Sequence, residues 1–283
     1  MMWLCLLIQF NKIMKPFNKL IIVTVLVFIE LLGSSSILAK EVEASSAAID
    51  IPISFNSDEG LQRLIRSSAK SDFAVLANHF EAQSNRAFCG PTTAAIILNS
   101  VFAKSSALPR DTSRIQPADL KNLNPGFDLT VARFTQETVI QKGQKTRAQI
   151  LGEPILINGK MMRDGGYQLR QFDEMLRANQ LKTKLTVVSN QMELNEVRED
   201  FIKNLQTAGD YLVVNYRREE VGQSGGAHIS PIGAYDRASD SVLILDVNPA
   251  AHSWVWIPLP ALFKAMKTFD KVENRGYVLI EAQ

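Results

Sequence analysis

The hydrophobic pattern of this chain of 283 residues changes near residue 211, and the change limits which folds are open to it. Before that point, apolar residues recur every three or four positions, which is typical of amphipathic helices. After it, short apolar runs alternate with turn-forming residues, which predicts β-strands. Helices first and antiparallel strands later predict an α+β fold whose helices pack on one side of a sheet. The expected strands are residues 211–216, 228–235, 242–247, 254–257 and 276–280, with a helix over 259–266.

Three helices and a short strand are expected before the strand-rich region. The first helix begins near Pro91, which suits a first helical turn because its missing N–H would be unpaired there anyway. The other two helices cover residues 169–176 and 194–205, and the strand covers 185–188. Residues 104–165 are polar and contain four prolines, so we expect loops with short helical fragments there.

The N-terminal residues have the layout of a secretory signal. Three lysines precede an apolar run of 13 residues, 20–32, and small residues follow it. Because about 20 apolar residues are needed to cross a bilayer, we expect no stable membrane span once the signal is removed. We predict cleavage after Ala39, with an uncleaved anchor as the alternative. The expected organisation is a signal peptide over 1–39 and one domain over 40–283, in an exported protein that is periplasmic or secreted.

The charge balance argues against a nucleic-acid partner. Residues 1–39 hold three basic side chains and one acidic side chain, so residues 40–283 keep 28 of each sign. A net charge near zero, without a basic run, lacks the electrostatic footprint of nucleic-acid binding. The 46% of hydrophobic residues in the sequence are enough for a substantial core in one domain.

The predicted mature chain contains a single cysteine, Cys89, at the start of the first expected helix. A helix N-terminus aims unpaired N–H groups and a partial positive charge at such a side chain, which favours thiolate over thiol. An unpaired cysteine in an oxidising compartment is therefore a candidate nucleophile. The alternative is a buried, inert cysteine that acts as a small apolar side chain.

The base for a cysteine nucleophile is usually a histidine, and the predicted mature chain has three. His228 lies 139 residues after Cys89, within the interval of about 130 to 150 residues found in papain-like enzymes. His79 is interpreted as a surface or helix-end histidine. His252 lies in a loop after Pro249 and is a weaker candidate. We therefore assign His228 as the candidate base.

Asp246 is the expected orienting group for the imidazole of His228. The residues Asp236 to Asp240 have turn chemistry, and positions 228 and 246 are equidistant from residue 237. We therefore expect the two side chains to face each other across neighbouring strands, about 5 Å apart at Cβ. A carboxylate in the apolar run 242–247 must also be paired or solvated. The alternative is a strand-end aspartate that binds loop backbone.

Two further motifs would complete such a site. Gln83 precedes Cys89 by six residues, which suits an amide that donates to an oxyanion together with the Cys89 backbone N–H. Gly225 and Gly226 lie just before His228 and would let a substrate approach the backbone closely. The alternatives are an exposed helix-end glutamine and simple loop flexibility.

Five separated strings together resemble the catalytic domain of phytochelatin synthases, in its bacterial, single-domain type. They are residues 85–90, 134–137, 222–235, 243–247 and 275–277. The resemblance implies a papain-like fold in which helices pack against an antiparallel sheet, with glutathione as the partner. It further implies that Cys89 attacks the cysteinyl carbonyl, His228 passes a proton to the departing glycine, and Asp246 holds the imidazole. A second glutathione would resolve the γ-glutamylcysteinyl thioester to a phytochelatin, and water would resolve it to γ-glutamylcysteine.

The resemblance also implies roles outside these three residues. Arg275 resembles the arginine that the family uses near the γ-glutamyl carboxylate, with a surface salt bridge as the alternative. Thioester formation needs no cofactor, and heavy metal ions such as cadmium or zinc would enter as a metal–thiolate substrate or as an activator. Residues 248–252 depart from the basic, aromatic stretch that the family usually has there. We therefore expect hydrolysis of glutathione to compete strongly with peptide transfer.

Three other interpretations stay open. A papain-like leader peptidase also uses a Cys-Gly-Pro motif with an upstream glutamine, but its histidine follows the cysteine at a much shorter distance. A non-catalytic protein that binds glutathione or a thiol peptide would keep the fold without turnover. A zinc site built from Cys89, His228 and Asp246 lacks a fourth ligand at metal-type spacing, so we assign no metal ligands. The sequence carries no signal for the oligomeric state.

Overall fold

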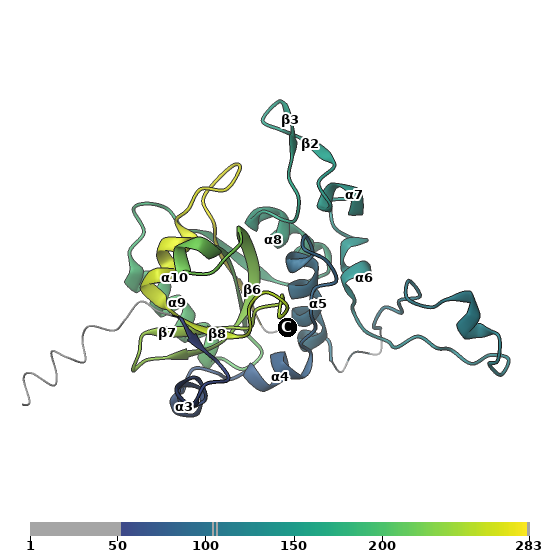
Figure 1. Cartoon of the computed structure of the whole chain (residues 1–283), viewed down its shortest axis with the longest axis horizontal. Helices are drawn as coiled ribbons and strands as arrows, with labels where there is room; N and C mark the ends of the chain where they lie inside the picture. Colours follow the sequence, from purple (N-terminus) through teal and green to yellow (C-terminus); the bar gives the residue numbers. More distant parts are fainter. Residues whose placement is uncertain (1–51, 104, 106, 282–283) are drawn as a thin grey trace, which may run out of the picture. The chain divides into compact units, whose positions relative to one another are not determined.

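The computed structural model describes residues 52–103, 105 and 107–281 (Figure 1). These described residues belong to one compact unit. The predicted signal segment, residues 1–39, lies outside the described residues. Within the described part of the chain, no helix combines the length and the apolar character that crossing a bilayer requires.

A seven-stranded antiparallel sheet forms the centre of the fold, in the order β1-β8-β7-β6-β5-β9-β4. All the strands expected after residue 211 are present, and the predicted α+β class is confirmed. The bounds are β1 (Ile53–Ser54), β4 (Thr183–Val187), β5 (Tyr211–Arg217), β6 (Ala227–Asp236), β7 (Ser241–Ile244), β8 (Val255–Pro258) and β9 (Gly276–Ile280).

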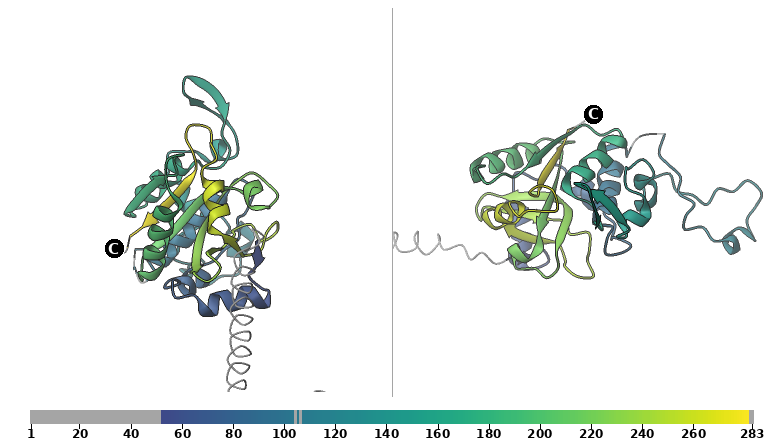
Figure 2. Two further views of the ribbon diagram at one scale, coloured as in Figure 1. Left: turned by 90° about the vertical axis from the view of Figure 1, so that its left-hand side faces the viewer. Right: turned by 90° about the horizontal axis from the view of Figure 1, so that it is seen from above.

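Helices cover both faces of this sheet (Figures 1 and 2). Along β5, Tyr211 and Val213 join one apolar core, whereas Leu212 and Val214 join the other. The first core contains α5 and α8, and the second contains α9 and α10. The prediction that helices pack on one side is therefore wrong, because strands that are apolar on both faces need cover on both.

The helices are α3 (Asp58–Arg66), α4 (Phe73–Asn78), α5 (Cys89–Val101), α6 (Gln136–Ile140), α7 (Arg147–Ile150), α8 (Leu169–Ala178), α9 (Leu194–Gln206) and α10 (Leu259–Met266), with 3-10 turns η1 (Pro117–Leu120) and η2 (Arg218–Val221).

Helix α5 is the buried element that positions the candidate site. Every residue from Cys89 to Ser100 is buried, as expected for a helix with small and apolar residues all round. The hydroxyl of Thr93 donates to the backbone carbonyl of Ile229 at 3.1 Å. This hydrogen bond fixes the first turns of α5 against the beginning of β6, the strand that carries His228.

A separate β-hairpin interrupts the region in which the sequence analysis expected only loops and helical fragments. Strands β2 (Pro154–Ile157) and β3 (Lys160–Arg163) pair through a two-residue turn. Both turn residues, Asn158 and Gly159, have positive φ, at 49° and 77°. The hairpin extends away from the helices around it (Figures 1 and 2). An Asn-Gly pair between two segments that contain apolar residues is a strong hairpin signal. The prediction of only loops and helical fragments is therefore wrong for residues 154–163.

Candidate active site

The thiol of Cys89 and the imidazole of His228 meet where the start of α5 packs on the start of β6. Cys89 is the first residue of α5, so its backbone N–H has no partner within the helix. The buried imidazole of His228 hydrogen-bonds the Cys89 thiol. Its Nε2 lies 3.0 Å from Oδ1 of Asp246, which leaves Nδ1 as the ring nitrogen that faces the thiol. The structure therefore brings the three predicted residues together.

The register of β6 and β7 differs from the predicted one. Ile232 pairs with Ile244, and continuing this register by two residues sets Ser230 opposite Asp246. The prediction that positions 228 and 246 directly oppose each other is therefore wrong. His228 nevertheless points to the same face as Ser230, because the two residues are two apart on a strand. Its imidazole reaches the carboxylate diagonally.

The position of the turn explains this difference, and a bulge partly offsets it. The turn occupies residues 237–240, so its centre lies beyond residue 237. The register shifts again between Ile232 and Ala234, around Gly233. A Cβ atom at Gly233 would lie 3.0 Å from the Phe73 ring and 3.1 Å from the Leu245 side chain, so the bulge packs tightly. Turn chemistry gave the approximate centre of the hairpin and could not show the bulge.

Arg218 is a second partner of Asp246 that the sequence analysis missed. Its Nη1 lies 2.7 Å from Oδ2, and its Nη2 donates to Oδ1 at 3.0 Å. Both side chains are buried, at 5% and 0% exposure. One hydrogen bond and one further ion-pair contact from the same guanidinium hold the carboxylate that the imidazole faces. In the sequence, Arg218 belongs to a run with Arg217, Glu219 and Glu220, which reads as a solvated charge cluster.

Further side chains hold the imidazole and the guanidinium. The hydroxyl of Ser230 lies 2.8 Å from Nε2 of His228, and the ring of Tyr216 meets the imidazole edge-on with centroids 5.9 Å apart. The carbonyl oxygen of the Gln223 side chain accepts hydrogen bonds from Tyr216 at 3.2 Å and from Arg218 at 3.1 Å. These contacts link the imidazole, the carboxylate and the loop before β6 into one network.

The electrostatics of this network favour a thiolate beside an imidazolium. Burial raises the pKa of Cys89, but the hydrogen bond and the charge of His228 lower it below that of an ordinary thiol. Burial lowers the pKa of His228, whereas Asp246 and the thiolate raise it above its usual range. Burial raises the pKa of Asp246, but His228 and Arg218 bring it down to about 2. The site therefore holds the charges of an activated cysteine nucleophile.

A pocket of about 230 Å³ opens at the thiol. Its volume suits a small peptide-like group, and its walls combine backbone, an aromatic ring and one exposed cation. The residues that line it are Arg86, Ala87, Cys89, Gly165, Gly166, Tyr167, Ala227, His228 and Ile229.

Gln83, Gly225 and Gly226 lie near this network but not in the pocket wall. The side-chain amide of Gln83 donates to the carbonyl of Asn85 at 2.8 Å, and it carries a second N–H. Gly225 has a φ of 104°, and a Cβ atom there would lie 3.2 Å from Cδ of Arg218. The carbonyl of Gly226 accepts from the Arg218 backbone N–H at 3.1 Å. Oxyanion donation by Gln83 and substrate contact by the glycines stay predictions.

Arg275 lies in a buried cluster of its own. Its Nη2 contacts Asp270 at 3.1 Å, and its Nη1 donates to the hydroxyl of Thr268 and the carbonyl of Phe269, each at 2.9 Å. Arg275 is only 5% exposed, so the alternative of a surface salt bridge is wrong. Its Nε is buried and has no hydrogen-bond partner among the described residues. The predicted contact with a γ-glutamyl carboxylate stays a prediction.

The two other histidines lie outside the network. His79 caps the C-terminal end of α4. Nε2 of His252 donates to the Ser224 carbonyl, 2.9 Å away, and His252 lines a separate pocket of about 430 Å³. Among the residues that the structure describes, no group of three or more His, Cys, Asp and Glu side chains is arranged to hold a metal ion.

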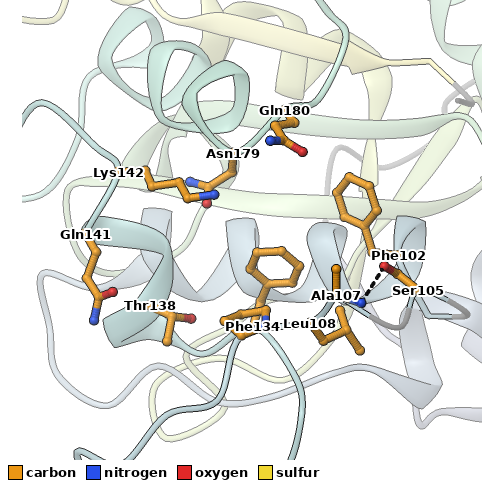
Figure 3. A pocket seen from close by; sticks show the side chains of 11 residues that line it. Phe102, Ser105, Ala107, Leu108, Phe134, Thr138, Gln141, Lys142, Asn179 and Gln180 are labelled. Atoms are coloured by element: carbon orange, nitrogen blue, oxygen red, sulfur yellow. Dashed lines mark hydrogen bonds between the residues drawn. The ribbon is translucent and has the colours of Figure 1, made fainter.

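A further pocket, of about 300 Å³, lies at the opposite end of α5 (Figure 3). The rings of Phe102 and Phe134 form its apolar part, and Lys142 and Asn179 stand at its polar edge. Because α5 has 13 residues, its two ends are about 20 Å apart. This pocket contains none of the residues that surround the thiol, so its larger volume does not make it the candidate site.

Comparisons with known proteins agree with this geometry. The family model for phytochelatin synthase matches residues 46–118 and 127–277. The chain is 25% identical over 221 residues to a glutathione gamma-glutamylcysteinyltransferase of Schizosaccharomyces pombe, covering 77% of this chain and 45% of that protein. It is 27% identical over 252 residues to glutathione gamma-glutamylcysteinyltransferase 3 of Lotus japonicus, covering 87% and 45%. The chain thus spans less than half the length of these relatives. The predicted papain-like fold is confirmed, and the chain belongs to the phytochelatin synthase family.

Proposed function

We propose that this protein is a thiol acyltransferase and hydrolase that acts on glutathione. The observation that carries the proposal is the buried arrangement of Cys89, His228 and Asp246, of which Cys89 and His228 line a pocket of about 230 Å³. The names of the relatives point to the same substrate. Because this chain spans 45% of each relative, their activity is a proposal for it.

The first half of the reaction forms a thioester. The Cys89 thiolate attacks the carbonyl carbon between the cysteine and the glycine of γ-Glu-Cys-Gly. The C–N bond breaks, and the His228 imidazolium gives its proton to the glycine nitrogen. The oxyanion forms beside the Cys89 backbone N–H, which the helix start leaves unpaired. Glycine leaves, and the γ-glutamylcysteinyl group stays on the sulfur while Asp246 holds the now neutral imidazole.

The second half of the reaction releases the acyl group. Either water or the α-amino group of a second glutathione attacks the thioester, and neutral His228 accepts the proton that the nucleophile loses. The C–S bond breaks, so Cys89 leaves as thiolate and the original ion pair returns. Water gives γ-glutamylcysteine, and a second glutathione gives a phytochelatin with one added γ-Glu-Cys unit.

The balance between the two acceptors is part of the proposal. Residues 248–252 follow Asp246 and lack the basic, aromatic character expected for binding a second substrate. Hydrolysis therefore competes strongly with transfer. Heavy metal ions such as cadmium or zinc act, in this scheme, as part of a metal–thiolate substrate or as activators.

Export of the protein would expose its thiol to oxidation. We infer the signal peptide over residues 1–39 from its sequence layout. Cys89 is a free cysteine, with no disulfide partner among the described residues. A low-pKa thiol that oxidises or is capped by glutathione then needs an external reductant. Activity is expected to depend on added reductant, and full activity after mild oxidation would contradict this inference.

The decisive assay uses reduced glutathione and mass spectrometry. Wild-type protein and a Cys89→Ala control are incubated with glutathione, with and without cadmium. Free glycine together with γ-glutamylcysteine or longer γ-Glu-Cys oligomers, absent from the control, supports the proposal. The ratio of the two products measures hydrolysis against transfer. No glycine release by the reduced wild-type protein would favour a non-catalytic binder or a leader peptidase instead.

A further inference from the structure

One wall of the candidate active-site pocket is a short segment between β3 and α8. Gly165, Gly166 and Tyr167 all line the pocket. A Cβ atom on Gly90, the residue after the nucleophile, would lie 3.0 Å from the Tyr167 ring. A Cβ atom on Gly166, whose φ is 75°, would lie 3.6 Å from the Ala87 carbonyl oxygen. The segment therefore packs directly on the residues around the nucleophile.

Lys145 holds this segment from the interior of the protein. Its Nζ donates to the carbonyl of Asp164 at 2.6 Å and to the carbonyl of Gly166 at 2.7 Å. The same Nζ lies 3.1 Å from the Asp164 carboxylate. The two carbonyls flank Gly165, so a single ammonium group joins both ends of the two-glycine stretch. Lys145 and Asp164 are 6% and 3% exposed.

The Asp164 carboxylate extends the same network to α8. Its Oδ2 accepts hydrogen bonds from the side-chain amides of Gln168 and Gln171, each at 3.0 Å. The Lys145 ammonium also stands 5.6 Å from the centre of the Tyr167 ring. Gly166 and Tyr167 thus both contact an ammonium group that is itself held by Asp164.

Burying a lysine ammonium group removes it from water, and this desolvation opposes folding. Burial brings the pKa of Lys145 below its ordinary value, although the charge and hydrogen bond of Asp164 raise it. Replacing a buried ion pair by apolar residues of similar volume is often neutral or stabilising. A pair of glycines, in contrast, has unusual backbone freedom that must be removed if the wall is to keep one shape. Lys145 is placed where it can restrict the backbone of these two glycines.

We propose that Lys145 is a positioning residue that fixes the Gly165–Tyr167 wall and thereby sets the affinity of the pocket for the γ-glutamylcysteinyl part of glutathione. The inference rests on the proposed function, in which the acyl carbon bonds to Cys89 and the acyl group fills the pocket beside it. Lys145 contacts the wall and not the thiol, the imidazole or Asp246. It therefore acts on substrate binding and leaves the reactivity of the thiol unchanged.

The test compares Lys145→Met with two matched variants. Lys142→Met removes an exposed lysine three positions earlier and serves as the control. Asp164→Asn keeps both backbone carbonyls for Lys145 and removes only the carboxylate charge. For Lys145→Met, KM for glutathione rises at least about tenfold, kcat stays within about threefold, and the rate of Cys89 alkylation by iodoacetamide is unchanged. Asp164→Asn raises KM less than Lys145→Met, and Lys142→Met changes nothing.

Three outcomes would overturn the inference. A folded Lys145→Met protein that keeps the wild-type KM shows that the wall does not depend on the ammonium. A loss of alkylation rate and kcat in parallel with KM shows a general structural role. An Asp164→Asn effect as large as that of Lys145→Met shows that the ion pair, and not the carbonyl contacts, is responsible. If Lys145→Met does not fold, Lys145→Gln is judged by the same criteria. Absence of glycine release by the wild type contradicts the proposed function itself, whereas wild-type turnover with an unchanged Lys145 variant contradicts this inference alone.

Discussion

The two ends of helix α5 border pockets of similar size, yet they differ in what they can do. At the N-terminal end, a pocket of about 230 Å³ meets Cys89, whose thiolate the helix dipole and His228 stabilise. At the C-terminal end, a pocket of about 300 Å³ meets Phe102, Phe134 and the amide of Asn179 (Figure 3). The smaller pocket contains the connected titratable groups, and the larger one does not. The candidate site in this protein is therefore identified by its hydrogen-bonded titratable groups and not by the volume of its pocket.

The strongest test of this contrast is removal of the nucleophile. We expect Cys89→Ala to reduce glycine release at least about a thousandfold, because Cys89 is the only thiol among the described residues. The product assay by mass spectrometry measures this directly. Activity within tenfold of wild type would place the chemistry elsewhere in the molecule.

Neutralising the orienting carboxylate should have the next largest effect. Asp246→Asn keeps the shape of the side chain but removes the charge that stabilises the imidazolium and leaves Arg218 without its ion-pair partner. We expect kcat to fall by about a hundredfold to ten-thousandfold, as for other orienting carboxylates beside a catalytic histidine. Steady-state kinetics with glutathione provides the measurement. A loss smaller than tenfold would show that Ser230 and Tyr216 suffice to hold the imidazole.

Arg218 and its neighbour Arg217 allow a matched comparison of buried and exposed cations. Arg218 is 5% exposed and pairs with Asp246, whereas Arg217 is 49% exposed and pairs with Glu219. We expect Arg218→Met to lower the free energy of unfolding by about 3 to 5 kcal/mol, since it leaves a buried carboxylate without its guanidinium. Arg217→Met should change it by less than about 1 kcal/mol. Equal effects in urea unfolding would contradict the assigned role of the buried pair.

The pH dependence of thiol reactivity tests the electrostatics of the N-terminal end. The pKa of Cys89 is lowered by His228 against the effect of burial, so the reactive thiolate persists below the pH range of ordinary thiols. In His228→Gln the effect of burial remains and the lowering by His228 is gone, so the midpoint of the alkylation profile moves upward. Rates of iodoacetamide reaction across pH give the midpoint. The same midpoint in both proteins would remove His228 as the cause.

The smallest effect is expected at the other end of the helix. Lys142→Ala alters the edge of the pocket in Figure 3 without touching any residue of the Cys89 network. We expect kcat/KM for glutathione to stay within about twofold of wild type. A tenfold change in the same assay would show that the two ends of α5 are coupled.

The residues that chemistry requires were easier to predict than the residues that hold them. Cysteine and histidine are rare in this chain. The position of Cys89 at a helix start and its spacing from His228 were therefore enough to predict both residues. Asp246 followed from turn chemistry, although the turn is centred beyond residue 237 and the register therefore sets Ser230, not His228, opposite Asp246. Neither Arg218 nor Lys145 lies in a sequence pattern that distinguishes it from a charged surface residue, yet the fold buries both side chains. The roles of these two residues depend on burial by segments that are distant in the sequence. No local sequence pattern predicts that burial.

The central claim concerns a covalent intermediate, and its most direct test is intact-protein mass spectrometry after rapid acid quenching. Reduced wild-type protein mixed with glutathione should gain the mass of one γ-glutamylcysteinyl group, and fragmentation should locate it on the peptide that contains Cys89. The added mass should resist a non-nucleophilic reductant and be absent from Cys89→Ala. A mass gain of whole glutathione that the reductant removes, or an acyl group on another residue, would contradict the account.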